Sequence, residues 1–185
     1  GSVFLAGTFG AGVYRSTNNG ADWTQSSSGW SGGNVRAFCI NGGSVFGGSY
    51  NSPPVYKSTD DGATWTASGS GITSELTYAI VGSGTRVYTG SSGGVHSTTD
   101  NGSTWTDSPS PLGKQATYSM LIRGGTVYAG TSGNGPYRST DNGASWTQAA
   151  GNLPAGSSRG TLALAADSTY LYIGTYAGIY RSSDN

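Results

Sequence analysis

The side chains best suited to acid–base chemistry in this chain are its few carboxylates. The 185 residues include nine Asp and Glu, nine Lys and Arg, and one His. Glycoside hydrolysis needs two carboxyl groups roughly 5 to 10 Å apart, one as acid and the other as base or nucleophile. Most of the carboxylates here belong to one short motif that recurs along the chain. The role of that motif therefore decides what chemistry is available.

The motif has eight residues and the pattern Ser/Thr-x-Asp-x-Gly-x-x-Trp. Its full copies span residues 16–23, 58–65, 98–105 and 139–146, and a further copy begins at Ser182. Successive copies are about 41 residues apart, a period typical of propeller blades. The Asn-Gly or Asp-Gly pair at the centre predicts a two-residue type I′ hairpin turn, because both residue types tolerate positive φ.

We expect the motif residues to be structural. A short side-chain oxygen before the turn can accept hydrogen bonds from backbone N–H groups, and each tryptophan can cover apolar surface beside its hairpin. Asn18 replaces aspartate in the first copy and can still accept these bonds. The residues with this predicted role are Asn18, Gly20, Trp23, Asp60, Gly62, Trp65, Asp100, Gly102, Trp105, Asp141, Gly143, Trp146 and Asp184.

The motif resembles the Asp-box, or BNR, repeat of sialidase-like and related β-propellers, and the resemblance covers essentially the whole chain. It implies four-stranded antiparallel blades in which the motif is the turn between the third and fourth strands, remote from a catalytic face. It also implies a secreted protein, extracellular or periplasmic. The sialidase catalytic motifs (three converging arginines, a tyrosine with a glutamate partner, and a Phe/Tyr-Arg-Ile-Pro sequence) are not recognisable in this chain.

The strand patterns predict an all-β propeller, or propeller segment, of about five repeats. Their approximate bounds are 1–33, 34–74, 75–115, 116–158 and 159–185. Each innermost strand alternates small and large residues, which suits a strand near the axis where blades converge. The first repeat lacks this inner strand and the last lacks its outer strand. Because uncovered sheet edges and faces promote association, we expect self-association or continuation in a longer chain.

Composition excludes several classes of partner. The formal net charge is zero, which removes the basic surface that nucleic-acid binding requires. Apolar runs are too short to insert in a membrane. The one histidine, His96, falls in a strand column and the one cysteine, Cys39, in an inner strand, so no metal site and no cofactor are expected.

A ligand site is expected at the end of the propeller opposite the repeated turns, which we call the variable-loop end. The loops before the inner strands and after the second strands meet there and hold the residues that do not repeat. Aromatic faces with neighbouring polar groups at such an end suit a glycan or a protein. The candidate ligand-binding residues are Phe9, Trp30, Tyr50, Glu75, Lys114, Asn152, Arg159 and Tyr176. For Trp30, both a binding contact and local packing remain open.

The sequence therefore favours a non-catalytic extracellular propeller that acts as an interaction, structural or assembly module. A lectin-like, glycan-binding propeller is the first alternative, and a glycoside hydrolase of the sialidase-like type is the second. The enzyme interpretation is weaker because Glu75 and Asp107 are the only carboxylates expected at the variable-loop end, and they belong to different loops.

Overall fold

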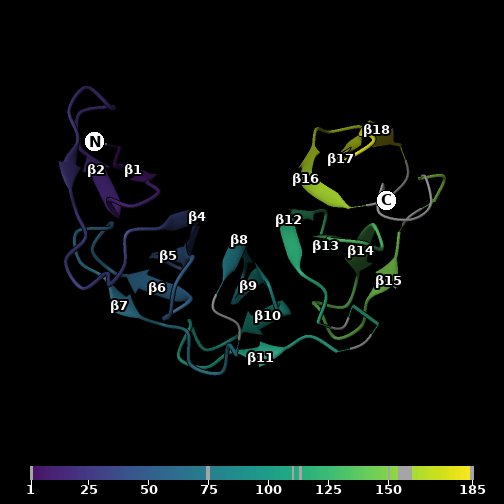
Figure 1. The fold of residues 1–185 in the computed structure, drawn as a ribbon, viewed down its shortest axis with the longest axis horizontal. Helices are drawn as coiled ribbons and strands as arrows, with labels where there is room; N and C mark the ends of the chain where they lie inside the picture. The colour runs from purple at the N-terminus through teal and green to yellow at the C-terminus, as the bar shows by residue number, and fades with distance from the viewer. Residues whose placement is uncertain are drawn as a thin grey trace.

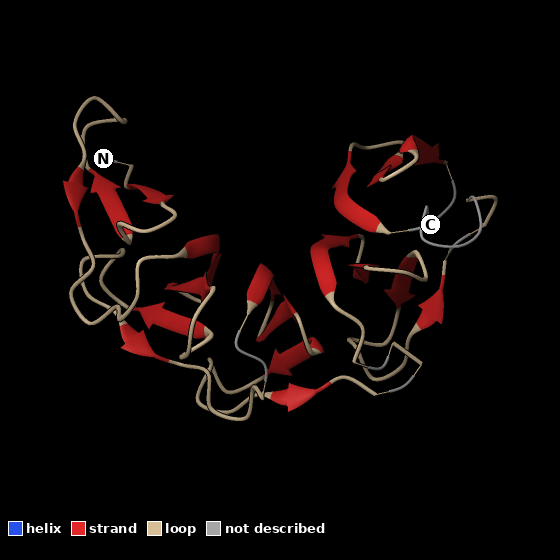
Figure 2. Cartoon of the chain, viewed as in Figure 1, coloured by secondary structure: helices blue, strands red, loops and turns tan. Residues whose placement is uncertain are grey.

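The computed structural model describes residues 2–73, 76–109, 111–112, 114–149, 151–153 and 160–183. These residues form eighteen strands in five antiparallel sheets (Figure 2). The sheets follow one another in chain order around a common centre, like the blades of a fan (Figure 1). The predicted β-propeller architecture is confirmed. No helix in this part of the chain is long and apolar enough to span a membrane.

Each sheet is a meander of strands that are adjacent in sequence. Sheet 1 contains β1 (Phe4–Gly7), β2 (Val13–Ser16) and β3 (Thr24–Gln25), and sheet 2 contains β4 (Val35–Asn41), β5 (Ser44–Ser49), β6 (Val55–Ser58) and β7 (Thr66–Ala67). Sheet 3 contains β8 (Thr77–Ser83), β9 (Arg86–Ser91), β10 (Gly94–Thr98) and β11 (Thr106–Asp107), and sheet 4 contains β12 (Thr117–Arg123), β13 (Thr126–Thr131), β14 (Pro136–Ser139) and β15 (Thr147–Gln148). Sheet 5 contains β16 (Thr161–Ala166), β17 (Leu171–Thr175) and β18 (Gly178–Ser182).

The inner wall of the fan is formed by β4, β8, β12 and β16, which contact one another in succession (Figure 1). Within the described ranges, sheet 1 has no strand inside β1 and sheet 5 has none outside β18. The prediction of a first repeat without its inner strand and a last repeat without its outer strand is therefore confirmed.

Every inner strand carries an irregularity at its second residue. The register with the neighbouring strand shifts between Val35 and Ala37, and likewise between Thr77 and Ala79. The same shift recurs at the start of β12 and of β16. Such a bulge leaves one residue outside the ladder and redirects its side chain. The residues in this position, which we call the bulge residues, are Arg36, Tyr78, Tyr118 and Leu162.

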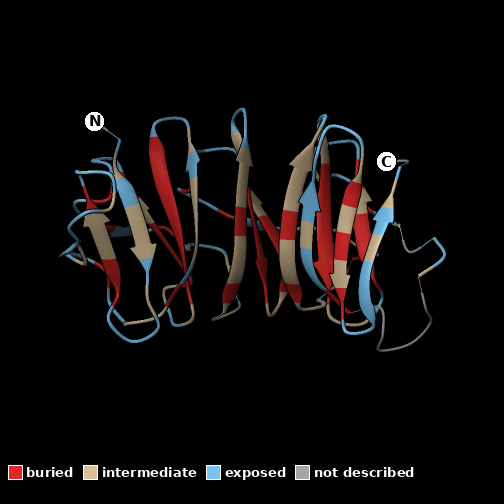
Figure 3. Ribbon diagram, turned by 90° about the horizontal axis from the view of Figure 1, so that it is seen from above, coloured by how far each residue is buried: buried red, intermediate tan, exposed pale blue. Residues whose placement is uncertain are grey.

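Adjacent sheets are held together by apolar packing. Each sheet has a leading face, toward the next sheet in the chain, and a trailing face, toward the previous one. Between sheets 2 and 3, Phe46 on the leading face meets Ile80 and Trp105 on the trailing face. The corresponding clusters lie between the other pairs of neighbouring sheets. Buried residues consequently run through the strands from sheet to sheet (Figure 3).

The repeated turn is held by a network around its acidic residue. Asp60 Oδ1 accepts hydrogen bonds from Ser58 Oγ at 2.7 Å and from the Thr64 amide at 2.9 Å, and Asp60 Oδ2 accepts one from Thr64 Oγ1 at 2.6 Å. The Gly62 amide donates to Ser58 Oγ. These hydrogen bonds, with the Thr64 hydroxyl foremost, lower the pKa of Asp60 to about 2. The carboxylate is thus occupied by the turn, and Asp141 forms the same network.

The turn geometry is type I′, but the connection is longer than predicted. Asp61 and Gly62 have φ of 55° and 80°, and the Ala63 amide donates to the Asp60 carbonyl. Strand β6 ends at Ser58 and β7 begins only at Thr66, so the prediction of a two-residue hairpin is wrong. The side-chain network draws the residues after the turn away from the ladder. Asp184, in the last copy of the motif, lies outside the described residues.

The motif tryptophans reach back to the preceding sheet. The indole N–H of Trp65 donates to the Ser26 carbonyl at 2.9 Å, and that of Trp105 donates to the Ser68 carbonyl. Trp65 is 3% exposed. Trp23 is 41% exposed and donates to the Gly20 carbonyl of its own turn, since no described sheet precedes it.

Candidate functional site

Four aromatic rings form a continuous row across sheets 1 to 4. Phe9 and Tyr50 have ring centroids 6.4 Å apart, Tyr50 and Tyr78 are 6.1 Å apart, and Tyr78 and Tyr118 are 5.2 Å apart. Each pair meets edge to face, the arrangement that aromatic quadrupoles prefer. We call these four residues the aromatic row.

Two kinds of position build the aromatic row. Tyr78 and Tyr118 are bulge residues at the start of inner strands. Phe9 and Tyr50 lie in the loops that follow β1 and β5, which are the second strands of the four-stranded pattern in sheets 1 and 2. The ends of these strands all lie at the variable-loop end. The row therefore follows the inner rim of the propeller on the side opposite the repeated turns.

The side chains of the row remain accessible. Phe9 is 79% exposed, and the three tyrosines are half-buried. Each ring of the row therefore keeps part of its surface in contact with solvent. Such a surface offers both stacking faces and hydroxyl donors to a ligand.

One cation belongs to this surface. The guanidinium of Arg36, itself a bulge residue, lies over the Tyr50 ring with its Cζ 5.2 Å from the centroid. Burial raises the pKa of Tyr78; the neighbouring Tyr50 and Tyr118 raise it further, and Arg36 opposes them. The Tyr78 phenol is thus a neutral hydrogen-bonding group around pH 7.

Backbone and amide contacts fix the loop that carries Tyr50. The Tyr50 amide donates to the Asn34 carbonyl at 3.3 Å, and Asn34 Nδ2 donates to Asn51 Oδ1 at 3.2 Å. The Asn51 amide donates to Ser49 Oγ. Asn34 also bridges to Phe9 in the preceding sheet. The first two rings are therefore positioned by one shared set of hydrogen bonds.

Of the predicted ligand-binding residues, the structure brings Phe9 and Tyr50 together and places Trp30 elsewhere. Trp30 is 6% exposed, stacks on Tyr56 at 4.3 Å and meets Trp65 edge-on. Its place in the candidate list needs correction, because the ring fills the interface between sheets 1 and 2. Local packing is the alternative that the structure supports.

The remaining candidates are dispersed. Lys114 is exposed near His96, and Asn152 lines a depression between sheets 4 and 5. Tyr176 is exposed and lies against Gly160. None of these three makes a described ring or hydrogen-bond contact with the aromatic row. Glu75 and Arg159 lie outside the described residues.

The carboxylate of Asp107 is engaged with the histidine. His96 Nε2 lies 3.0 Å from Asp107 Oδ1, and Ser91 Oγ lies 3.4 Å from His96 Nδ1. Burial lowers the pKa of His96, Asp107 opposes this effect, and Lys114 adds to it. The order Ser–His–Asp suggests a nucleophilic triad, but Ser91 is fully buried and its hydroxyl donates to the Gly94 carbonyl. The serine and the histidine are therefore enclosed, and of the three side chains only Asp107, at 55% exposed, reaches solvent.

Metal ligation finds no support in the described ranges, where no three His, Cys, Asp or Glu side chains cluster. Burial raises the pKa of the Cys39 thiol to about 11, so it is not a thiolate near neutral pH.

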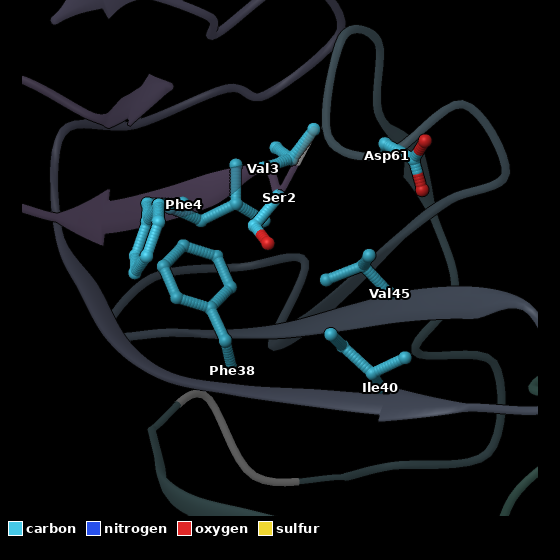
Figure 4. Close-up of a pocket in the computed structure, with 8 residues that line it drawn as sticks. Ser2, Val3, Phe4, Phe38, Ile40, Val45 and Asp61 are labelled. Carbon is cyan, nitrogen blue, oxygen red and sulfur yellow. The ribbon is translucent and has the colours of Figure 1, made fainter. Parts of the chain in front are cut away.

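A second concave feature lies beside β1, where sheet 1 has no inner strand (Figure 4). This groove has a volume of about 690 Å³ and is lined mainly by apolar side chains, among them Phe4, Phe38 and Ile40. Asp61 and Ser2 are its polar lining residues. The groove therefore offers mainly apolar contact surface.

Sequence reasoning missed three residues of the site: Arg36, Tyr78 and Tyr118. All three are the second residue of an inner strand, for which the sequence predicts only an alternation of small and large side chains. A signal did exist, because large or charged side chains recur at the second residue of every inner strand while the following residue is small. The bulge that frees these side chains appears only in the register.

Comparison with known proteins agrees with this architecture. The extracellular domain of BT4673 from B. thetaiotaomicron superposes with a TM-score of 0.79 at 18% identity, covering 100% of this chain and 25% of that chain. The GH74 enzyme of Niastella koreensis superposes with a TM-score of 0.72 at 25% identity, covering 97% and 28%. YCF48 bound to D1 peptide gives a TM-score of 0.69 at 15% identity, covering 99% and 61%.

The chain thus spans about a quarter of the length of the first two of these structures. No curated protein matches it in sequence. A family model, that of the DUF6242 beta propeller domain, matches residues 1–112. With its propeller sheets and this match, the chain belongs to the DUF6242 beta propeller domain family.

Proposed function

We propose that this domain is a non-catalytic, extracellular recognition module whose ligand surface is the aromatic row. The observation that carries the proposal is the unbroken series Phe9–Tyr50–Tyr78–Tyr118 with Arg36 beside it. The row crosses four sheets, so it suits an extended ligand better than a compact one.

A glycan is the ligand class that fits this surface best. Sugar rings stack on aromatic faces, and phenol and guanidinium groups can hydrogen-bond to sugar hydroxyls. The chain has no net charge, and the row contains a single cation and no described carboxylate. A neutral or weakly anionic polysaccharide is consistent with these features.

The extracellular location is part of the same proposal. It rests on the resemblance of the repeated turn to the Asp-box of secreted propellers, and the hydrogen-bond network around Asp60 fits that motif. The non-catalytic character is supported by Asp107, whose carboxylate contacts His96. No ring, cation or hydrogen-bond contact joins a described carboxylate to the rings of the row.

Binding of polysaccharides by Tyr78→Ala and the wild type tests the ligand surface. Loss of one ring from the row should weaken binding by about threefold to tenfold in isothermal titration, from the usual strength of an aromatic contact. Tyr170→Ala is the matched control, since Tyr170 also lies under an arginine, Arg181 at 4.7 Å, but belongs to the opposite end of the propeller.

Two results would overturn the proposal. Equal binding by the wild type and Tyr78→Ala, or absence of binding to any glycan on an array, would remove the aromatic row as a glycan surface. Release of new reducing ends from a bound polysaccharide would show that the domain is a hydrolase.

A further inference from the structure

The leading face of sheet 5 and the trailing face of sheet 1 have no neighbouring sheet among the described residues. The repeat positions that are buried between neighbouring sheets elsewhere are exposed on these two faces. On the leading face, Val13 of sheet 1 and Val55 of sheet 2 are 0% exposed, and Ile179 at the equivalent position of sheet 5 is 83% exposed. Tyr172 takes the place of the fully buried Tyr128 and is only half-buried. The leading face of sheet 5 is therefore an uncovered copy of an internal packing surface.

The trailing face of sheet 1 shows the complementary pattern. Phe4 is 46% exposed, and Val45 and Val87 at the equivalent position are buried. Trp23 is exposed where Trp65 is buried against the preceding sheet. This face is thus an uncovered copy of the partner surface.

Polar contacts between sheets follow the same repeat. Arg15 Nε donates to the Asp61 carbonyl at 2.9 Å, and Lys57 Nζ donates to the Asn101 carbonyl at 3.0 Å. Each bond joins the leading side of one sheet to the repeated turn of the next. In sheet 5 the equivalent residue is Arg181, which is exposed and stacks on Tyr170.

We infer that the leading face of sheet 5 binds the trailing face of sheet 1 of a second copy of this chain, head to tail. The contact continues an interface that occurs four times within the fold. Ile179 packs on Phe4 and Trp23 of the other copy, and Arg181 donates to the carbonyl of its Asn19. This contact is heterologous, since the two copies contribute different surfaces. It is independent of the aromatic row.

The mass of residues 1–185, followed by light scattering over a wide concentration range, tests this inference. The wild type should exceed the monomer mass increasingly with concentration. Ile179→Asp, which spoils the leading face, and Phe4→Asp, which spoils the trailing face, should each associate at least about tenfold more weakly, since each places a charge in an apolar contact. Trp23→Gln provides a second trailing-face variant in case Phe4→Asp folds poorly, as judged by circular dichroism.

Mixing the two variants distinguishes this contact from others. Ile179→Asp keeps an intact trailing face and Phe4→Asp keeps an intact leading face, so an equimolar mixture should form dimers and nothing larger. Leu162→Asp is the matched control, because Leu162 is 42% exposed and is a bulge residue at the variable-loop end, and this variant should associate like the wild type.

Three outcomes would overturn the inference. They are a wild type that stays monomeric throughout, single variants that associate like the wild type, and a mixture of the two variants that stays monomeric. Association by Phe4→Asp alone would indicate a symmetric contact between leading faces in place of the head-to-tail one.

Discussion

The same substitution at two copies of the motif should have very different effects on stability. Trp65 and Trp23 occupy the same position in the repeat, but among the described sheets only Trp65 has a preceding sheet to pack against. Trp65→Ala should therefore lower the free energy of unfolding much more than Trp23→Ala.

The contacts of each ring set the magnitudes. Trp65 meets Trp30 at 5.1 Å and Phe38 at 5.8 Å, and its indole N–H bonds to the preceding sheet. Truncating a buried tryptophan to alanine costs about 3–5 kcal/mol. Trp23 is 41% exposed and bonds only within its own turn, so its loss should cost about 1 kcal/mol. The expected difference is about 2–4 kcal/mol.

Urea unfolding followed by circular dichroism measures this difference. Both variants are made in the Ile179→Asp background, so that association does not contribute to stability. The slope m should stay unchanged in both, which keeps the comparison to stability alone. The reasoning is that the tryptophan stabilises the fold through its burial between sheets. If Trp23→Ala lowered the free energy of unfolding as much as Trp65→Ala, or more, this reasoning would be refuted.

Three further effects follow from the turn and the buried histidine. The pKa of Asp60 is about 2 in the fold and near 4 in the unfolded chain, so its ionised carboxylate stabilises the fold above about pH 4 and loses this effect as the pH falls toward 2. In Asp60→Asn the urea midpoint should therefore depend less on pH between about 4 and 2 than in the wild type. The same pH dependence in both proteins would contradict this. Gly62→Ala should lower the free energy of unfolding by about 1 kcal/mol more than Gly124→Ala. Both glycines have positive φ, but only at position 62 would the new methyl group press on the preceding sheet, at Leu5. Equal urea midpoints for the two variants would contradict this. Asp107→Asn removes the charge that opposes burial, so the pKa of His96 should fall further in an NMR titration; no change would show that the carboxylate does not act on the imidazole.

Much of the fold could be predicted because the repeat reports on it several times. The motif spacing located the sheets, and the Asn-Gly and Asp-Gly pairs located the type I′ turns. The length of the connection was wrong, because the bonds from Ser58 and Thr64 to Asp60 extend the turn beyond the two central residues. Side-chain networks of this kind are not evident from turn propensity.

The candidate site was only partly predictable. Phe9 and Tyr50 stood out because they interrupt the repeat in loops. Tyr78 and Tyr118 did not, because a bulge is a feature of register, and register depends on the partner strand. Trp30 stood out for the same reason as Phe9, yet its ring packs on Tyr56. A residue that departs from the repeat can be recognised in the sequence, but the sequence does not show whether its side chain is buried or exposed.

The bulge at the start of each inner strand also determines which positions of this chain can be varied. Because the bulge residue is outside the ladder, its identity is uncoupled from the pairing that holds the sheet. Arginine, tyrosine and leucine all occur at this position here. Substitution at one position per blade can therefore change the side chains of the inner rim while the strand pairing is kept, which makes these positions suitable for variant libraries.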